Sequence, residues 1–316
     1  MKRILITGAG GQLGTELTSA LRRRYGSESV LATDLRDPAE WASDDGPSAA
    51  LDCLDRDSIA QTADHYGATA IYHLAAILSA AGEANPELAY RVNMDGLINV
   101  LHVAGKRGSR VFVPSSIAAF GPDTPRDPTP QVTIQRPTTM YGVTKVAAEL
   151  LCDYYHLRYG VDARGVRYPG LISYTAPPGG GTTDYAVDIF HQALATGHYT
   201  CFLEAGTQMD MMYMADAVRA AIELMEAPDE GLTHRNAYNV TAMQFTPETL
   251  AAAIREHIPD FTIDYAPDPV RQAIADSWPR SLDDSAARTQ WGWKHEYDLD
   301  RLVTVMLDGL RGAGPD

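Results

Sequence analysis

The sequence is poor in cysteine, in positive charge and in long apolar runs. Its three cysteines, Cys53, Cys152 and Cys201, form no Cys-x-x-Cys pair, and its nine histidines show no paired metal-ligand spacing. Sparse, scattered thiols are typical of a reducing compartment, so we expect a cytoplasmic protein and no metal site. Twenty-six Lys and Arg against 41 Asp and Glu give a net charge of −15, which argues against nucleic acid or an anionic membrane as a partner.

The apolar runs that do occur are short. None reaches about 18 residues, which argues against a membrane span. After the basic start Met-Lys-Arg, the apolar stretch is too short for a secretory signal and runs directly into glycines. This start predicts a first β-strand instead.

Over residues 2–167, short β-rich apolar runs alternate with longer amphipathic stretches. The runs predict strands at residues 3–7, 29–33, 70–73, 110–114 and 163–167, and the amphipathic stretches predict helices at 12–24, 56–66, 87–107 and 140–159. This alternation predicts an α/β fold, a Rossmann-type doubly wound parallel sheet with helices on both faces.

The pattern loosens after Arg167, where Pro177-Pro178-Gly179-Gly180-Gly181 predicts a loop or hinge. Helices expected near residues 184–196, 214–226, 246–257 and 298–310 are mixed with short strands. We therefore expect a Rossmann domain of residues 1–167 plus roughly 213–240, and a smaller, partly interleaved C-terminal lobe of residues 168–212 and 241–316.

A glycine-rich turn, Thr7-Gly8-Ala9-Gly10-Gly11-Gln12-Leu13-Gly14, follows the first expected strand and opens the first helix. Gly8, Gly11 and Gly14 allow a tight turn that a pyrophosphate can approach, and the first helical N–H groups, at Gln12 and Leu13, face the phosphates. Many glycine-rich turns are only turns. Here a strand before it and a helix after it favour dinucleotide binding.

Asp34 ends the second expected strand, 20 residues beyond Gly14, where a carboxylate hydrogen-bonds the adenosine ribose. The same charge repels a 2′-phosphate, so we expect NAD as the cofactor, although Arg36 nearby leaves NADP open. Asp52 ends the next short strand and is a candidate for contact with the adenine. A solvated loop aspartate is the alternative for both carboxylates.

Tyr141 and Lys145 lie four residues apart at the start of an expected helix, so both side chains point to one cleft. A free tyrosine has a pKa of about 10, and a nearby ammonium favours the phenolate. Tyr141 could then take the proton of a substrate hydroxyl while hydride leaves the same carbon. A lone Tyr-x-x-x-Lys is common by chance, but Ser116 after the preceding strand can hold the same oxygen.

Together these residues resemble the extended short-chain dehydrogenases, the group that contains the nucleotide-sugar epimerases. The shared motifs are the glycine turn Gly8/Gly11/Gly14, Asp34, His73-Leu74-Ala75-Ala76, Ser116/Tyr141/Lys145 and Arg167-Tyr168-Pro169-Gly170. The resemblance covers nearly the whole chain. It implies further cofactor contacts from Leu74, Ala75, Ala76 and Tyr168.

The chain departs from the nucleotide-sugar enzymes at Met209, where they often carry an arginine that meets the substrate phosphates. It is more similar to the short-chain-type L-threonine 3-dehydrogenases, with one departure, Asp210, where proline is expected. The similar stretches are residues 114–122, 137–145, 179–186, 211–214, 276–279 and 291–294. The resemblance implies metal-independent oxidation of L-threonine to 2-amino-3-ketobutyrate with NAD⁺. It also implies a homodimer formed through the helices near 87–107 and 140–159.

The resemblance also implies a pocket for a small zwitterion. Ser79 contacts the substrate, and Thr182, Thr183 and Asp184 lie at a helix N-terminus that suits a carboxylate. Simple helix capping by Thr182 and Asp184 is an equally good interpretation. Trp278 closes the pocket as an apolar lid, or else packs in a core.

Two other functions remain open from the sequence. One is a nucleotide-sugar 4-epimerase or dehydratase with retained NAD, against which Met209 argues. The other is a non-catalytic NAD-sensing regulator, against which the intact set of Ser116, Tyr141 and Lys145 argues.

Overall fold

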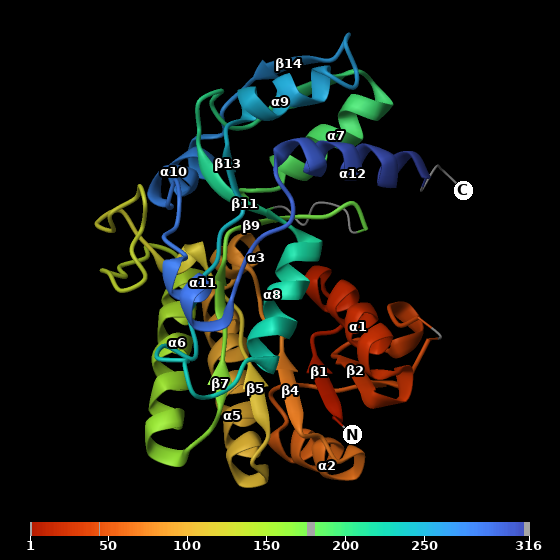
Figure 1. Ribbon diagram of the computed structural model, residues 1–316, viewed down its shortest axis with the longest axis vertical. Coiled ribbons are helices and arrows are strands. Elements are labelled where there is room, and N and C mark those ends of the chain that lie inside the picture. The colour runs from red at the N-terminus through yellow and green to blue at the C-terminus, as the bar shows by residue number, and fades with distance from the viewer. Residues whose placement is uncertain (1, 44, 176–180, 313–316) are drawn as a thin grey trace.

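The computed structural model describes residues 2–43, 45–175 and 181–312. The predicted hinge at 177–181 lies outside these residues except for Gly181. In Figure 1 a larger α/β part carries a smaller lobe that contains α7, α9, α12 and β14.

The larger part is built on a six-stranded parallel sheet of order β3-β2-β1-β4-β5-β7. The strands are β1 (Ile4–Thr7), β2 (Val30–Asp34), β3 (Ser48–Ala50), β4 (Ala70–His73), β5 (Arg110–Phe112) and β7 (Ala163–Arg164). All four residues of β1 are buried, as expected for a strand covered on both faces. The strand order reverses beside β1, and ligands bind at the carboxyl ends of the strands at such a switch point.

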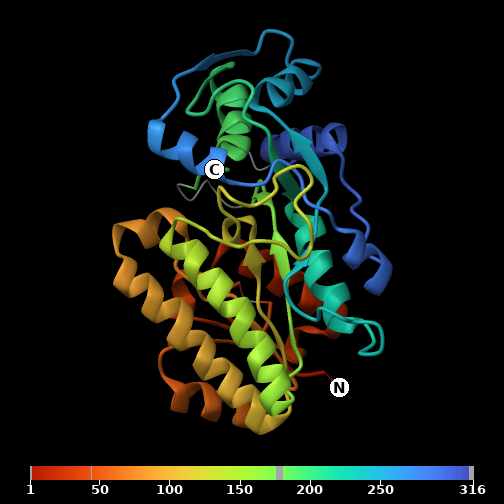
Figure 2. The same cartoon turned by 90° about the vertical axis from the view of Figure 1, so that its left-hand side faces the viewer.

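Helices cover both faces of this sheet, which confirms the predicted doubly wound fold. They are α1 (Gln12–Tyr25) and α8 (Met214–Glu226) on one face, and α2 (Arg56–Tyr66), α5 (Gly96–Arg107) and α6 (Met140–Tyr159) on the other. Successive side chains of β1 point into two different apolar cores, one on each face of the sheet. Ile4 and Ile6 pack with α1 and α8, and Leu5 packs with α2 and α5. Figure 2 shows α5 and α6 side by side.

The helix expected at 87–107 is interrupted. It consists of α4 (Pro86–Tyr90), one π-helical turn (Arg91–Asp95) and α5. The turn contains Asn93, which is buried and bonded across to Ile77 and Thr144. Single π turns inside helices are frequent at functional sites.

Shorter strands carry the chain from the large sheet into the lobe. A parallel group of order β12-β8-β6 joins Tyr238–Asn239, Val166–Tyr168 and Ser115–Ser116, and a mixed group of order β13-β11-β9 joins Met243–Phe245, Met209–Tyr213 and Gly170–Ile172. The remaining elements are α3 (Ser79–Ala84), α7 (Tyr185–Ala195), β10 (His198–Cys201), α9 (Pro247–Arg255), β14 (Thr262–Tyr265), α10 (Pro269–Ser277), α11 (Ser285–Trp291) and α12 (Leu299–Gly312).

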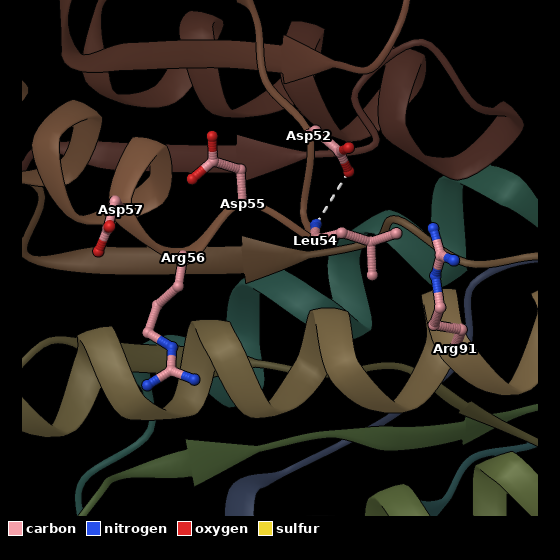
Figure 3. A pocket seen from close by; sticks show the side chains of 6 residues that line it. All are labelled: Asp52, Leu54, Asp55, Arg56, Asp57 and Arg91. Carbon is pink, nitrogen blue, oxygen red and sulfur yellow. Dashed lines mark hydrogen bonds between the residues drawn. The ribbon is translucent and has the colours of Figure 1, made fainter.

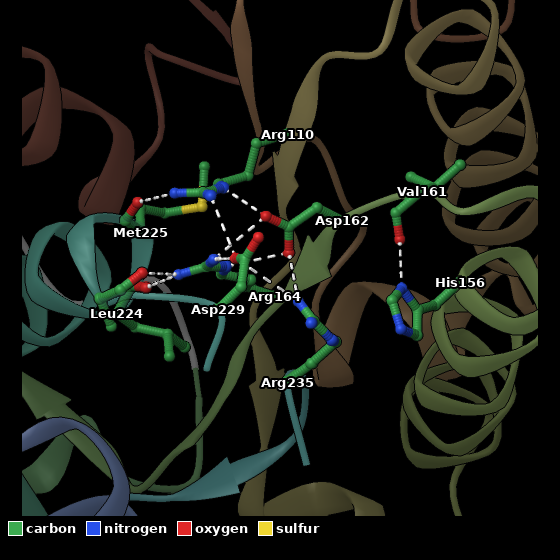
Figure 4. A network of polar contacts seen from close by, with 10 residues as sticks. Arg110, His156, Val161, Asp162, Arg164, Leu224, Met225, Asp229 and Arg235 are labelled. Atoms are coloured by element: carbon green, nitrogen blue, oxygen red, sulfur yellow. Dashed lines mark hydrogen bonds and ion pairs between the residues drawn. The ribbon is translucent and has the colours of Figure 1, made fainter. Parts of the chain in front are cut away.

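A buried charge network fixes α8 to the sheet (Figure 4). Arg164 is fully buried and donates to the carbonyls of Leu224 and Ala227 at 2.7 and 2.6 Å, at the end of α8. Arg110 donates to Met225 O at 2.6 Å, and both arginines pair with Asp162. The last carbonyls of a helix have no partner within it, so these guanidiniums satisfy them.

The division into two domains stays a prediction, but the packing bears on it. Residues of α8 share a core with α1 and β1, in line with a segment that returns to the Rossmann part. Ala287 and Trp293, expected in the lobe, pack in the same core.

Candidate active site

The glycine turn is held against the segment that follows β4. Gly8 has φ of +75°, and a Cβ there would collide with the backbone of Leu74 and Ala75. A Cβ at Gly14 would collide with the carbonyls of Gly8 and Ala9. Helix α1 begins at Gln12, and among the described residues no side chain caps it. Its first N–H groups are therefore available to an anion, and the turn fits a dinucleotide pyrophosphate.

Asp34 lies beside this turn at the end of β2. Its carboxylate accepts from Gly10 N at 3.1 Å and from Arg36 N and Nε at 3.2 and 3.0 Å. Burial opposes ionisation, but the hydrogen bonds from Arg36 outweigh it and lower the pKa of Asp34. Asp34 is therefore ionised at neutral pH, as its predicted role in the selection of NAD requires. Arg36 is a partner of this carboxylate rather than a free phosphate ligand.

Replacement of Asp34 by Ala is expected to weaken the discrimination between the two cofactors. The wild type should bind NAD⁺ at least 100-fold more tightly than NADP⁺, because bringing like charges together costs several kcal/mol. In Asp34→Ala the freed Arg36 can meet a 2′-phosphate, so the ratio should fall below about tenfold. Titration of protein fluorescence with both dinucleotides measures it. Asp37→Ala removes a nearby charge as a control, and equal affinities in the wild type would contradict the prediction.

Asp52 lies at the edge of an open pocket of about 520 Å³ (Figure 3). Its carboxylate accepts from Leu54 N at 2.9 Å, and Asp55, Arg56, Asp57 and Arg91 complete the lining. The pocket is past the end of β3, beside the strand that carries Asp34. We keep contact of Asp52 with the adenine as a proposal.

A second, small pocket contains the motif after β4. His73, Leu74, Ala75 and Ala76 line it together with Asn93, Thr144 and Lys145. His73 is buried, and burial together with the charge of Lys145 lowers its pKa to about 3, so the ring is neutral. Thr7 bonds its Nδ1 at 2.8 Å. One wall of this pocket is the Leu74–Ala75 backbone that packs on Gly8, and another is the helix that carries Lys145.

Ser116, Tyr141 and Lys145 are brought together where β6 meets the start of α6. Thr139 caps α6 by accepting from Gly142 N at 3.1 Å, which places Tyr141 in the first turn. The Lys145 ammonium lies 5.3 Å from the centre of the Tyr141 ring, and Ser116 is close enough to the phenol to lower its pKa against the effect of burial. Lys145 Nζ also donates to Pro114 O at 2.7 Å.

The phenol of Tyr141 is more weakly acidic than the sequence suggested. Burial raises its pKa to about 12, while Ser116 opposes the change. Burial lowers the pKa of Lys145 to about 8, against the attraction of Glu149. The reason is geometric: the ammonium is directed to the Pro114 carbonyl, so burial outweighs its effect on the phenol.

Ser79 opens α3, which packs against α6. Glu83 of the same helix accepts from Met140 N at 2.7 Å, so α3 is fixed beside Tyr141. Ser79 is half-buried there. This position agrees with a substrate contact, which stays a proposal.

The segment before α7 packs on β9. Thr182 is buried, and Thr183 packs on Gly170 so closely that a Cβ at Gly170 would collide with it. Asp184 is the N-cap of α7, and its carboxylate turns back to accept from Gly181 N at 2.7 Å. The helix therefore begins one residue later than expected.

The side chains of two expected site residues, Trp278 and Tyr168, are buried in the interior. Trp278 is only 7% exposed and packs in one apolar cluster with Ile117, Tyr185 and the ring of Tyr141. Tyr168 is buried, and its hydroxyl donates to Ala217 O at 2.7 Å. Its side chain is thus engaged with α8, which leaves its backbone for any cofactor contact.

Two features of the site were not identified from the sequence. Asn93 bridges the segment after β4 to Thr144, and Glu149 forms a buried ion pair with Arg167 behind Lys145. Asn93 looked like an ordinary polar helix residue, while Glu149 and Arg167 are 18 positions apart. The spacing of Lys145 and Glu149, four residues on one helix, was the only available hint.

Over residues 2–43, 45–175 and 181–312, no group of three or more His, Cys, Asp or Glu side chains could hold a metal ion. In the same ranges no helix has both the length and the apolarity that a membrane crossing demands.

A Rossmann fold, a cradle for a dinucleotide and a Ser/Tyr/Lys set beside it define an NAD-dependent oxidoreductase of the extended short-chain type. The chain belongs to the NAD dependent epimerase/dehydratase family, whose sequence model matches residues 4–241. NAD, the cofactor expected from the sequence, is thereby confirmed.

Known proteins are similar over nearly the whole chain. An uncharacterised epimerase/dehydratase of Staphylococcus aureus is 54% identical over 98% of this chain and 97% of its own. The structure of L-threonine dehydrogenase from Clostridium difficile is 53% identical with a TM-score of 0.98, covering 99% of each chain. The GalE-like L-threonine dehydrogenase from Cupriavidus necator, in its holo form, is 52% identical with a TM-score of 0.95, covering 97% of this chain and 99% of that one.

Proposed function

We propose that the protein oxidises L-threonine to 2-amino-3-ketobutyrate with NAD⁺. The observation that carries the proposal is the similarity, over 99% of both chains, to an L-threonine dehydrogenase. The lobe supports it, because Met209, the position of a phosphate-binding arginine in many nucleotide-sugar enzymes, is fully buried. A thioether inside a core cannot pair with a phosphate.

In the proposed reaction two bonds of the substrate break, the C–H bond of the β-carbon and the O–H bond of the hydroxyl attached to it, and a ketone forms. Bound NAD⁺ would supply the hydride acceptor for this carbon. Tyr141 takes the hydroxyl proton as general base, Ser116 holds the oxygen by a hydrogen bond, and Lys145 stabilises the phenolate. Gly8 to Gly14, Asp34 and the Leu74–Ala76 segment hold the cofactor.

The substrate carboxylate is proposed to lie at the Thr182–Thr183 wall, where the 11-residue helix α7 begins. Helix N-termini favour anions, and threonine hydroxyls can donate to a carboxylate. Ser79 and the Tyr141–Ser116 pair would bind from the other side. Three fixed attachments define one configuration at the reacting carbon.

The assay that tests the proposal follows NADH absorbance with L-threonine, D-threonine and a UDP-sugar. L-threonine should be oxidised without added metal and faster at alkaline pH, and a chelator should not slow the reaction. D-threonine should be at least about 100-fold poorer, because a misplacement of about 1 Å can cost that much. Epimerisation of the UDP-sugar without NADH from L-threonine would establish the second candidate, a nucleotide-sugar epimerase or dehydratase, which the S. aureus relative's description favours.

We also propose a homodimer through α5 and α6. Val143, Leu150, Tyr154 and Leu157 are exposed, and their spacing places them on one face of α6, as in a helix that packs on a second subunit. Leu150→Lys with Leu157→Lys should convert the dimer to a monomer in light scattering, while Val132→Lys in an exposed loop should not. A monomeric wild type at micromolar concentration would disprove the dimer. The cytoplasmic location stays a prediction.

A further inference from the structure

Glu149 extends the line of site residues by one helical turn. Tyr141, Lys145 and Glu149 are spaced by four residues on α6 and so share one face. Glu149 is buried, and its carboxylate accepts four hydrogen bonds. The donors are Ser115 Oγ, Gln135 Nε2 at 2.7 Å, and Arg167 Nε and Nη2 at 2.9 and 2.8 Å.

Two consecutive residues beside Ser116 are hydrogen-bonded to side chains of this line, and Ser116 itself lies beside the third. The Pro114 carbonyl accepts from Lys145 and the Ser115 hydroxyl donates to Glu149, while Ser116 is close enough to Tyr141 to act on its pKa. The position of Ser116 relative to Tyr141 therefore depends on the anchor one residue before it.

Arg167 fixes Glu149 from behind. Besides the carboxylate, its Nη1 donates to Gln131 O at 2.9 Å and Asn239 Oδ1 at 3.1 Å, and its guanidinium lies 5.1 Å from the Phe120 ring. The pair thus ties α6 to β8, β12 and the loop before α6. These contacts hold the carboxylate in one place, one helical turn beyond Lys145.

Glu149 is also the charge that acts on Lys145. The titratable groups facing the ammonium are Tyr141, Glu149 and Cys152 on α6 and His73 on β4. His73 is neutral, and burial keeps the Cys152 thiol and the Tyr141 phenol protonated at neutral pH. Arg167 lies behind Glu149. Among these groups of the described chain, only the Glu149 carboxylate favours the charged form of Lys145.

We propose that Glu149, held by Arg167, is a positioning residue that keeps the Lys145 ammonium charged and places Ser116 through Ser115. Its catalytic consequence rests on the proposed function, since it acts through the Ser116–Tyr141–Lys145 set. Its electrostatic consequence does not, because it is a property of the protein alone.

The chain has four lysines, Lys2, Lys106, Lys145 and Lys294, and the other three are exposed. Lysine-selective ¹³C labelling of the full protein therefore gives four Cε signals, each assignable with a Lys→Arg variant. Their pH titration reads the pKa of Lys145 directly, without substrate or cofactor.

The pKa of Lys145 in a set of charge variants distinguishes the proposed role of Glu149 from a merely structural one. E149Q should lower the pKa of Lys145 by about 1, the low end for loss of a close opposite charge. R167M should not lower it. D153N, one turn further along α6, is the matched control and should leave it unchanged. S115A should also leave it unchanged but reduce kcat about tenfold, because only the anchor of Ser116 is lost.

E149Q leaves Arg167 buried without its counter-charge and can unfold the protein, so E149M/R167M is the second variant. Replacing both partners of a buried pair by apolar residues is often tolerated. The pKa of Lys145 should fall in this double variant too. An unchanged pKa in E149Q or E149M/R167M overturns the proposal.

A catalytic measurement completes the test. In E149Q the alkaline limb of kcat/KM for L-threonine should move to lower pH by the same amount as the Lys145 pKa, with little change at pH 6. If L-threonine is not a substrate, the proposed function fails while the titration still decides the role of Glu149. A shifted pKa with an unmoved alkaline limb would overturn the catalytic part.

Discussion

Replacement of Tyr141 by Phe is expected to lower kcat by on the order of 10²–10⁴, the range for loss of a positioned general base. The phenyl ring keeps its place against the apolar cluster of Ile117, Tyr185 and Trp278, so the fold and the affinity for NAD⁺ should stay close to the wild type. Stopped-flow or steady-state NADH formation measures kcat, and fluorescence titration measures NAD⁺ binding. Tyr159→Phe, at the exposed end of the same helix, is the control.

The same variant should also change the pH dependence. Because burial raises the pKa of Tyr141 to about 12, the phenolate fraction of the wild type grows tenfold per pH unit below that value. Lys145, with its pKa lowered to about 8, loses its charge above that pH, so the rise should flatten there. The two groups interact, and the measured values belong to the pair. Tyr141→Phe should lose the rise, and a retained rise with near-normal kcat would show that another group is the base.

Much of the fold follows from local patterns. The helices at 56–66, 140–159 and 214–226 begin and end at the predicted residues, because amphipathic periodicity and boundary signals such as Asp55 and Gly160 agree. The strand expected at 110–114 ends at Phe112 instead, and β6 takes up the pairing at Ser115. Such breaks depend on which neighbouring strand supplies partners, and a single segment does not contain that information.

The site was predictable to the extent that it depends on spacing. Tyr141 and Lys145 share a helical face by their four-residue separation, and the glycine turn lies between a strand and a helix. Contacts between distant segments could not be predicted. Examples are the ion pair of Glu149 with Arg167 and the hydrogen bond from the Tyr168 hydroxyl to α8. The pKa of Tyr141 was also beyond sequence reasoning, because it depends on burial and on where the Lys145 ammonium points.

Replacement of Gly14 by Ala is expected to weaken NAD⁺ binding at least about 100-fold. The added Cβ would collide with the carbonyls of Gly8 and Ala9, which are backbone of the turn itself and cannot rotate away as a side chain would. The turn must therefore move as a unit, and with it the first N–H groups of α1. A displacement of about 1 Å is enough for an effect of this size in a preorganised site. Titration of protein fluorescence with NAD⁺ gives the dissociation constant.

The control for this change is Gly206→Ala. Gly206 also lies outside the left-handed region, but no heavy atom lies within 4 Å of the Cβ that it would gain. The two variants add the same methyl group, so a general effect of replacing glycine by alanine would appear in both. NAD⁺ affinity should fall in Gly14→Ala alone, with circular dichroism showing that both variants are folded. If Gly14→Ala binds NAD⁺ as tightly as Gly206→Ala, the close contact of the turn with α1 does not set the cofactor site, and the dinucleotide must be held mainly by the Asp34 and Leu74–Ala76 side of the cradle.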